Sequence, residues 1–299
     1  MKVEDEYATT SAWDMLKIRL RGSKTTIRTI VKNPISATGL VIIVVLVILS
    51  IISPFIAPYD PIDVVLESRL LPPSSEHWLG TDNFGRDILS RILIGSRLSL
   101  ISGFVVIFTA VIIGIVAGSL AGYYGKWVDE IIMRITDIFM AFPSFLLAMI
   151  VVSVLGKGVG NVLIAMVIVW WPIYTRLIRG QVLVLRETPM IESERALGAS
   201  SGRILLRHVL PNSFTPVLVQ ASMDVGFAIL VVAGLSFLGL GAQPPIPEWG
   251  SMIAEGRTYI EIAWWFPVFP GITISAAVLG FNLFGDGLRD AFDPKLRGR

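Results

Sequence analysis

A charged island separates two long apolar runs, and it reads Glu192-Ser193-Glu194-Arg195-Ala196-Leu197-Gly198, then after a short polar interval Arg207-His208-Val209-Leu210-Pro211. Thr188 can cap a helix that has Pro189 at its first position, and Gly198 can adopt the left-handed conformation that ends it. A serine just after the turn can cap a second helix, which Pro211 is expected to stop. The island is therefore predicted to be a hairpin of two short helices, a shape suited to docking onto a partner.

The composition of the whole chain indicates a membrane protein. Of its 299 residues, 54% are hydrophobic and only 16% are charged, and the mean hydropathy is +0.72. This is more apolar surface than a soluble domain can bury in one core. A membrane-spanning helix needs about 20 apolar residues, and six runs qualify: 35–57, 98–124, 138–156, 158–175, 213–240 and 262–285. The third is expected to begin earlier, near Asp129. We therefore expect an all-α integral membrane protein with six transmembrane helices.

The basic residues set the predicted orientation. The first run begins too far into the chain, and is too long, for a cleavable signal peptide, so it is expected to remain as a helix. Cytoplasmic segments are rich in Lys and Arg, and the two ends of the chain carry Lys17, Arg19, Arg21, Lys24, Arg28 and Lys32, and Lys295, Arg297 and Arg299. Both termini are therefore expected in the cytoplasm, in a multi-pass protein of the cell membrane, with the charged island also inside.

The basic residues of one segment do not fit this orientation. Arg86, Arg91 and Arg97 fall between the first and second runs, which the topology places outside. We expect that this segment is folded, paired with Asp82 and Asp87, or partly embedded in the membrane.

The sequence lacks the residues that several kinds of chemistry need. The chain has no cysteine, which excludes a disulfide framework, a thiolate metal site and cysteine catalysis. Its two histidines, His77 and His208, are expected on opposite sides of the membrane, so they cannot share a zinc ion. No phosphate-binding loop of the G-x-x-x-x-G-K-[ST] kind occurs. The net charge is only +2, and its basic excess lies at membrane edges, as orientation and contact with membrane lipid require. We expect no metal, no cofactor and no nucleic acid bound to this chain.

A second motif precedes the second apolar run, and it reads His77-Trp78-Leu79-Gly80-Thr81-Asp82-Asn83-Phe84-Gly85-Arg86-Asp87-Ile88-Leu89-Ser90-Arg91. Gly80 and Gly85 permit turns, and Asp87 or Thr81 can cap the helix that follows. Apolar residues at helical spacing come next, so physical reasoning alone favours an elbow that lays a helix on the bilayer surface.

The apolar runs carry their own packing signals. Gly114, Gly118 and Gly122 recur every fourth residue on one face, which favours close approach of another helix over a hinge. Pro143 and Pro172 are expected to kink or open the third and fourth helices. Opened backbone at membrane depth is tolerated only against protein or a watery path, so both prolines could line a translocation route.

Asp224 lies inside the fifth run, one helical turn after Gln220. A carboxylate at membrane depth costs several kcal/mol unless it faces water or a partner. Asp224 and Gln220 are therefore either pathway residues or partners of a neighbouring helix or subunit.

These motifs resemble a known family. The charged island is similar to the EAA loop of ABC importer permeases, in which Glu-Ala-Ala-x-x-x-Gly precedes Leu-Pro. Glu192, Gly198, Leu210 and Pro211 match, while Ser193 and Glu194 replace the two alanines. The outer motif resembles His-x-Leu-Gly-Thr-Asp-x-x-Gly-Arg-Asp of the second permease in the dipeptide, oligopeptide and nickel group. Further matches begin at Ile56, at Leu235, at Glu248 and at Asn282, and they extend the resemblance over residues 35–297.

The resemblance implies a type-I importer permease fold and a set of partners. It implies a second, similar permease, two ATPase subunits that bind ATP and Mg, and an extracytoplasmic solute-binding protein. It also implies the following organisation: a cytoplasmic basic segment 1–34, a first helix 35–57, an extracytoplasmic segment 58–97, a core domain 98–290 with the coupling loop 186–212, and a cytoplasmic tail 291–299. The coupling loop would sit in a groove of the ATPase.

The sequence leaves alternatives open for the transported solute and for the class of transporter. Related peptide permeases often carry a glutamate where this chain has Val232, so the resemblance leaves di- or oligopeptides, oligosaccharides and nickel open. A secondary transporter or channel would need a relay of charged residues within the helices, and Asp224 alone is a poor relay. A membrane enzyme is weaker still, because these motifs assemble no nucleophile, base and orienting group.

Overall fold

The computed structural model describes residue 31 and residues 33–292. The basic residues on which the predicted orientation rests, from Lys17 to Lys32 and from Lys295 to Arg299, lie outside the described residues, as do most of the predicted cytoplasmic segments 1–34 and 291–299. Where the chain is described, it is α-helical without a β-strand, apart from an isolated antiparallel bridge between Thr81 and Asp87. The predicted all-α fold is confirmed.

In the described part of the chain, five helical segments are long and apolar enough to cross a membrane. They are α2 (Pro34–Ile56), α3 (Ile88–Tyr124), α6 (Val159–Arg186), α11 (Trp265–Phe292), and the run Ser201–Phe237. That run contains α8 (Ser201–Ile204), η2 (Leu205–Val209) and α9 (Leu210–Phe237). A sixth span exists if the bent pair α4 (Lys126–Met140) and α5 (Ser144–Leu155) counts as one. The remaining elements are short: η1 (Leu66–Ser68), α7 (Pro189–Ala196), α10 (Trp249–Gly256) and η3 (Arg257–Tyr259).

The third predicted span differs most from expectation. In place of one helix from near Asp129 to residue 156, α4 and α5 are bent by 91° at a short break, although the early start is confirmed because α4 begins at Lys126. Pro143 is the N-cap of α5, and a proline disfavours helical backbone at the residue before it. The prediction that Pro143 opens this helix is confirmed. Pro172 behaves differently, because α6 continues through it and its side chain is buried.

Two other helices are longer than their apolar cores. The α3 helix begins at Ile88 rather than near residue 98, because Asp87 caps it by accepting the Ser90 N–H at 2.8 Å. The apolar stripe after the outer motif therefore forms the first turns of α3 and not a separate surface helix. The α6 helix continues to Arg186, beyond its predicted end at residue 175.

The glycine stripe of α3 forms a close helix contact. A Cβ added at Gly114 would lie 2.3 Å from the Tyr174 Cβ, and one at Gly122 would lie 2.9 Å from the Val182 Cβ. Both neighbours belong to α6. The predicted interhelical packing is confirmed.

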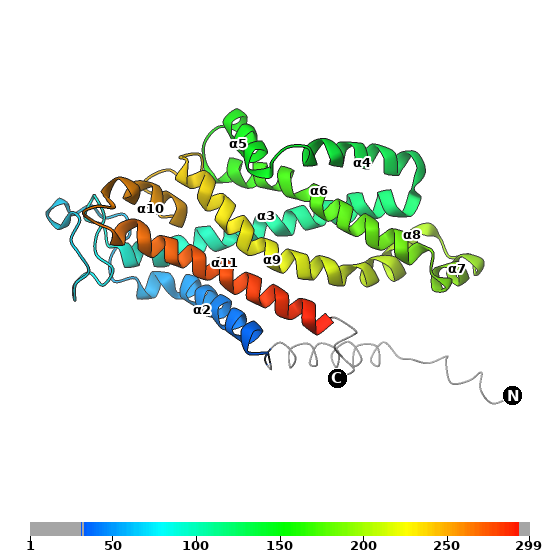
Figure 1. The fold of residues 1–299 in the computed structure, drawn as a ribbon, viewed down its shortest axis with the longest axis horizontal. Helices are drawn as coiled ribbons and strands as arrows, with labels where there is room; N and C mark the ends of the chain where they lie inside the picture. Colours follow the sequence, from blue (N-terminus) through cyan, green and yellow to red (C-terminus); the bar gives the residue numbers. More distant parts are fainter. Residues whose placement is uncertain (1–30, 32, 293–299) are drawn as a thin grey trace.

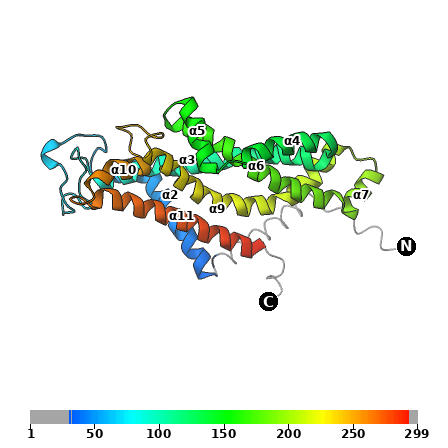
Figure 2. The same cartoon turned by 45° about the horizontal axis from the view of Figure 1, so that its top comes forward.

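The two motifs lie far apart in space. Segment 57–87 and α10 lie at one end of the long axis of the molecule, while α7 lies at the other end in both views (Figures 1 and 2). The long helices α3, α6, α9 (Leu210–Phe237) and α11 lie between the two ends.

Candidate functional site

The charged island forms the predicted hairpin. The α7 helix spans Pro189–Ala196, and Gly198 follows it with φ of +81°. The Gly198 N–H donates to the Arg195 carbonyl, and the Ala199 N–H donates to the Glu194 carbonyl, both at 3.0 Å. This pair of hydrogen bonds is the Schellman motif, in which a left-handed residue satisfies the last carbonyls of a helix. The glycine turn is confirmed.

The predicted side-chain caps do not form. Thr188 occupies the N-cap position of α7, but its hydroxyl donates to the Leu185 carbonyl at 2.7 Å. Ser200 occupies the N-cap position of α8 (Ser201–Ile204) without a side-chain hydrogen bond. Thr188 is drawn back toward α6, because the last carbonyls of that helix also lack helical donors.

The hairpin has one buried side and one exposed side. Ile191 is fully buried in the main core cluster, whereas Leu197 is 83% exposed. Glu192 and Ser193 are exposed as well. A Cβ added at Gly198 would meet no atom within 4 Å, so the turn needs glycine for its backbone conformation and not for space.

Two contacts tie α7 to the ends of other helices. The Arg195 guanidinium lies 5.9 Å from the ring centroid of Tyr123, near the end of α3. The His208 Nε2 atom lies 3.5 Å from the Glu194 Oε1 atom. Glu194 stands where the EAA pattern has alanine, and it contacts the segment that leads into α9.

The helix after the turn does not stop at Pro211, contrary to prediction. The chain passes from α8 through the π-helical turn η2 (Leu205–Val209) directly into α9. Pro211 lies in the first turn of α9, where its missing N–H costs least. The wider turn replaces a helix end, since the Leu210 N–H donates to the Leu205 carbonyl, five residues back. Residues Ser201–Phe237 therefore run as one long span.

At the other end of the molecule, the outer motif folds around buried ion pairs. The Asp82 Oδ2 atom accepts from Arg86 Nε at 2.6 Å and from an Arg91 guanidinium N–H at 2.7 Å. Both guanidinium groups also reach the Glu255 Oε2 atom of α10, at 2.8 Å for Arg86 and 3.2 Å for Arg91. The side chains of Asp82 and Arg91 are fully buried. The expectation that the outer segment is folded and paired is confirmed for Asp82 with Arg86 and Arg91.

Asp87 and Arg97 have other partners. Asp87 accepts at Oδ1 from His77 at 3.0 Å, and at Oδ2 from the Ser90 hydroxyl and N–H. Arg97 donates to the backbone carbonyl of Ser50 at 3.0 Å. The predicted pairing of Asp87 with Arg86, Arg91 or Arg97 is therefore wrong, because the Asp87 carboxylate already caps α3 and accepts from His77.

Both turn glycines of the outer motif have positive φ and crowded surroundings. The φ angle is +77° at Gly80 and at Gly85. A Cβ at Gly85 would lie 1.8 Å from the Val65 carbonyl oxygen, and one at Gly80 would lie 2.6 Å from the Trp265 ring. Thr81 lies between these turns and is fully buried. The outer motif thus packs against α11 and against the preceding segment.

Glu248 and Glu255 complete this region, and sequence reasoning did not assign either of them to it. Glu248 caps α10 by accepting the N–H groups of Gly250 and Ser251, each at 2.9 Å, and burial raises the pKa of its carboxyl. Burial also raises the pKa of Glu255, although the positive charge of Arg86 opposes the rise. The only signal in the sequence was an acidic pair around Trp249, which does not reveal a partner more than 150 residues away.

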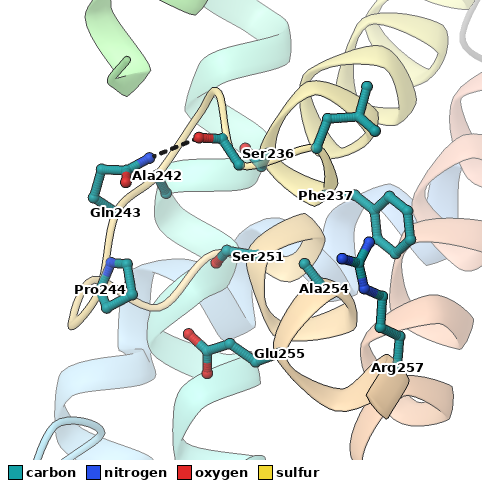
Figure 3. A pocket seen from close by; sticks show the side chains of 11 residues that line it. Ser236, Phe237, Ala242, Gln243, Pro244, Ser251, Ala254, Glu255 and Arg257 are labelled. Carbon is teal, nitrogen blue, oxygen red and sulfur yellow. Dashed lines mark hydrogen bonds between the residues drawn. The ribbon is translucent and has the colours of Figure 1, made fainter.

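An open cavity lies beside the ion pairs, between α10 and the segment that follows α9. Its volume is about 390 Å³, and Ser251, Glu255, Gln243 and Arg257 are among its lining residues (Figure 3). Arg257 lies over the ring of Phe237 at 5.1 Å from the centroid. The cavity brings a carboxylate, a guanidinium and an amide to the surface at the end of the molecule that carries the outer motif.

Asp224 has partners on its own helix and on a neighbouring one. The Tyr174 hydroxyl of α6 donates to Asp224 Oδ2 at 2.6 Å, and the Gln220 amide donates to Oδ1 at 2.9 Å. The partner expected on a neighbouring helix is confirmed. The pair joins the middle of α6 to the middle of α9, and Asp224 stays half-buried.

The comparisons with known proteins agree with this architecture. Residues 114–298, more than half of the chain, match the family described as the binding-protein-dependent transport system inner membrane component. The chain is a member of this family. Residues 23–73 also match the N-terminal transmembrane domain of oligopeptide transport permease C.

Individual permeases are similar over nearly their whole length. The dipeptide transport system permease protein DppC of Alkalihalophilus pseudofirmus is 46% identical over 98% of this chain and 93% of that protein. The probable D,D-dipeptide transport system permease protein DdpC of Escherichia coli is 47% identical over 89% of this chain and 90% of its own. The glutathione transport system permease protein GsiD of Pectobacterium atrosepticum is 48% identical over 87% of both chains.

A solved structure shares the fold. A chain of the MetNI methionine ABC transporter, solved in inward-facing conformations, aligns with a TM-score of 0.53 and 19% identity over 69% of this chain and 98% of that chain. The protein is therefore a multi-pass inner membrane permease with the MetI-like, type-I importer fold. As a permease of a binding-protein-dependent system, it works with an ATPase and a solute-binding protein.

Proposed function

We propose that this permease forms half of the translocation pathway of an ATP-driven importer of di- or oligopeptides. Its relatives in dipeptide and glutathione transport, at 46–48% identity, support a peptide solute. In the complete importer it would pair with a second, similar permease and two ATPase subunits, which bind ATP and Mg. The chain itself would perform no covalent chemistry.

The coupling loop 186–212 is proposed to be the contact with the ATPase. Its support is the exposed side of the hairpin, where Leu197 projects with 83% of its surface free. A hairpin that exposes both Leu197 and the charged Glu192 suits insertion into a groove that is apolar at its base and polar at its rim. The buried Ile191 keeps α7 attached to the transmembrane core.

The geometry offers a direct route for motion from this loop. The α6 helix leads into α7, and α8 continues through the π turn into α9. A displacement of α7 therefore acts on both long helices, which Tyr174 and Asp224 join near their middles. At its far end α9 leads to α10, which Glu255 fastens to the outer motif. In this proposal ATP binding moves the hairpin, and the outer end responds through α9.

Segment 58–97 is proposed to lie outside and to contribute to the binding-protein contact or the outer gate, with both termini in the cytoplasm. Single cysteines can be added to this cysteine-free chain. Glu67→Cys and Leu197→Cys place one thiol on an exposed residue at each end of the molecule. In right-side-out vesicles, an impermeant maleimide should label Glu67→Cys and should reach Leu197→Cys only after permeabilisation. The reverse pattern would overturn the orientation.

The transport proposal is tested by reconstituting the complete importer in proteoliposomes and measuring ATP-dependent uptake. A labelled dipeptide should accumulate and should compete with longer peptides. Uptake of an oligosaccharide or of Ni²⁺, with no uptake of peptide, would replace the solute while keeping the importer. Uptake driven by an ion gradient without ATP would contradict the importer itself and favour a secondary transporter or channel.

A further inference from the structure

Arg97 differs from the two arginines of the outer motif His77–Arg91. Arg86 and Arg91 are buried and paired with carboxylates, whereas Arg97 is exposed and has no ion pair in the described part of the chain. Its Nε atom donates to the Ser50 carbonyl at 3.0 Å, and an NH2 hydrogen reaches the Ile51 carbonyl at 3.4 Å. A positive charge thus lies on the apolar surface of α2 and α3 without a negative partner.

The position of this guanidinium is set by a proline. Pro54 lies inside α2 and has no N–H, so the Ser50 carbonyl loses its helical donor. The Ser53 hydroxyl and the Arg97 Nε atom donate to that carbonyl instead. A guanidinium carries five N–H donors, and the bonds to α2 use only part of them. The remaining donors are free for a ligand near the outer end of α2.

An apolar cavity adjoins this free charge. It has a volume of about 450 Å³ and lies between α2, α3 and α11, which pack against one another (Figure 1). Its apolar lining comes from Val47, Ile51, Leu100, Ile101, Phe104 and Phe281. Arg97 and Ser50 are the polar residues of its lining among the described residues.

The surface around the cavity is suited to hydrocarbon. Ile51, Ile101 and Phe104 are 61%, 58% and 60% exposed on helices that span the membrane. Membrane-spanning faces of this kind contact lipid tails. A hydrophilic solute such as a peptide would leave its backbone polar groups without partners in such a cavity.

We propose that this cavity binds one phospholipid of the extracytoplasmic leaflet, with an acyl chain against Leu100, Phe104 and Phe281 and the headgroup phosphate on Arg97. Guanidinium groups bind phosphate through two parallel charge-assisted hydrogen bonds. Arginines near the ends of membrane helices also reach toward the headgroup region. Such a phosphate would supply the Arg97 guanidinium with a negative partner beside its hydrogen bonds to the α2 carbonyls.

The test uses the importer in nanodiscs with trace phosphatidylglycerol that carries a photoreactive group at the end of one acyl chain. Illumination should label peptides that contain Leu100, Phe104 or Phe281. Arg97→Gln should lower this labelling by about tenfold, the loss that corresponds to about 1.4 kcal/mol. Val47→Trp should lower it similarly, because the larger side chain fills the cavity while Arg97 remains. Thermal unfolding of each variant verifies that it is folded.

Matched controls separate this site from other occupants. Arg69→Gln removes an exposed arginine of the same outer segment and should leave labelling unchanged. A photoreactive diacylglycerol with the same chains should label the cavity weakly, because it lacks the phosphate. Equal labelling by both lipids, or by the parent and Arg97→Gln, would indicate bulk lipid and overturn the proposal. Competition by inorganic phosphate, or contact of these residues with the second permease instead of lipid, would overturn it as well.

Discussion

The two ends of this permease carry similar sequence signals, but the side chains of one motif are buried and those of the other are largely exposed. Each motif combines charged residues with glycines at turns. In the outer motif the charges point inward, since Asp82 and Arg91 are fully buried and are bonded to each other. In the hairpin at the other end one side faces outward, and its Leu197 is 83% exposed. The end with the outer motif is held in one arrangement by its buried ion pairs, whereas the end with the hairpin exposes an apolar side chain to a possible partner.

Gly85 in the outer motif and Gly198 in the hairpin differ in the same way, because one is crowded and the other is not. At Gly85 an added Cβ would collide with the Val65 carbonyl oxygen at 1.8 Å, while at Gly198 it would meet nothing within 4 Å. Both have positive φ. A substitution at the outer glycine therefore disturbs packing, and one at the inner glycine changes only the local path of the chain.

The largest expected effect is in the outer ion pairs. Asp82→Asn removes the charge that two buried guanidinium groups share, and breaking a buried pair in this way costs about 3–5 kcal/mol. The thermal unfolding midpoint of the purified complex should fall strongly. The control is Asp63→Asn, an exposed acid of the same segment, which should leave the midpoint unchanged. Equal midpoints for the two variants would show that the outer end is not held by its charges.

Asp224 tests the link between the two ends. Asp224→Leu leaves the Tyr174 hydroxyl and the Gln220 amide without their acceptor, at a cost of about 1–3 kcal/mol. Asp224→Asn keeps one acceptor oxygen and should assemble normally while changing the transport rate or the solute preference. The comparison is made by measuring complex yield and vesicle uptake. Parent-like assembly and transport in both variants would remove Asp224 and Gln220 from the candidate pathway.

The coupling hairpin should separate stability from transport. Gly198→Val forces a β-branched residue into the left-handed region, at a cost of about 1–2 kcal/mol within the turn. Membrane insertion should persist, while transport and solute-stimulated ATP hydrolysis should fall. Gly202→Val is the matched control, because its added side chain also meets nothing within 4 Å and its φ is not positive. Undiminished stimulation in Gly198→Val would contradict the coupling role.

The smallest expected effect is at the contact between Glu194 and His208. Both side chains are partly exposed, with Nε2 and Oε1 at 3.5 Å, and exposed pairs contribute about 0–1 kcal/mol. Glu194→Gln should therefore leave the unfolding midpoint nearly unchanged. A fall as large as that of Asp82→Asn would show that the inner hairpin is also held by charge, and the contrast between the two ends would disappear.

The apolar runs predicted the fold because each span follows from a local property of about 20 residues. The glycine stripe at Gly114, Gly118 and Gly122 predicted close packing for the same reason, since its spacing sets one helix face. The sequence also predicted the turn at Gly198 and the pairing of Asp82 with arginines only a few residues away.

The features that the sequence did not predict depend on residues far apart in the chain or on which backbone conformation a proline adopts. Glu255 joins the outer motif from 169 residues after Arg86, and nothing local marks that partner. Pro211 predicted a helix end, but the π turn carries the helix through it. Pro143 and Pro172 are the same residue type in apolar runs, yet only Pro143 lies at a break. Tertiary packing decides such cases, and it is not visible in a single sequence.

The glycine stripe also constrains how this permease can move. A Cβ at Gly118 would lie 2.5 Å from the Thr175 carbonyl oxygen, so rotation of α3 about its axis would drive a side chain into the backbone of α6. We therefore expect the two helices to tilt together as one unit. Rearrangement between conformational states is then expected where the helical path is broken, at the 91° bend between α4 and α5. The smallest residues of α3 thus restrict where this permease can bend.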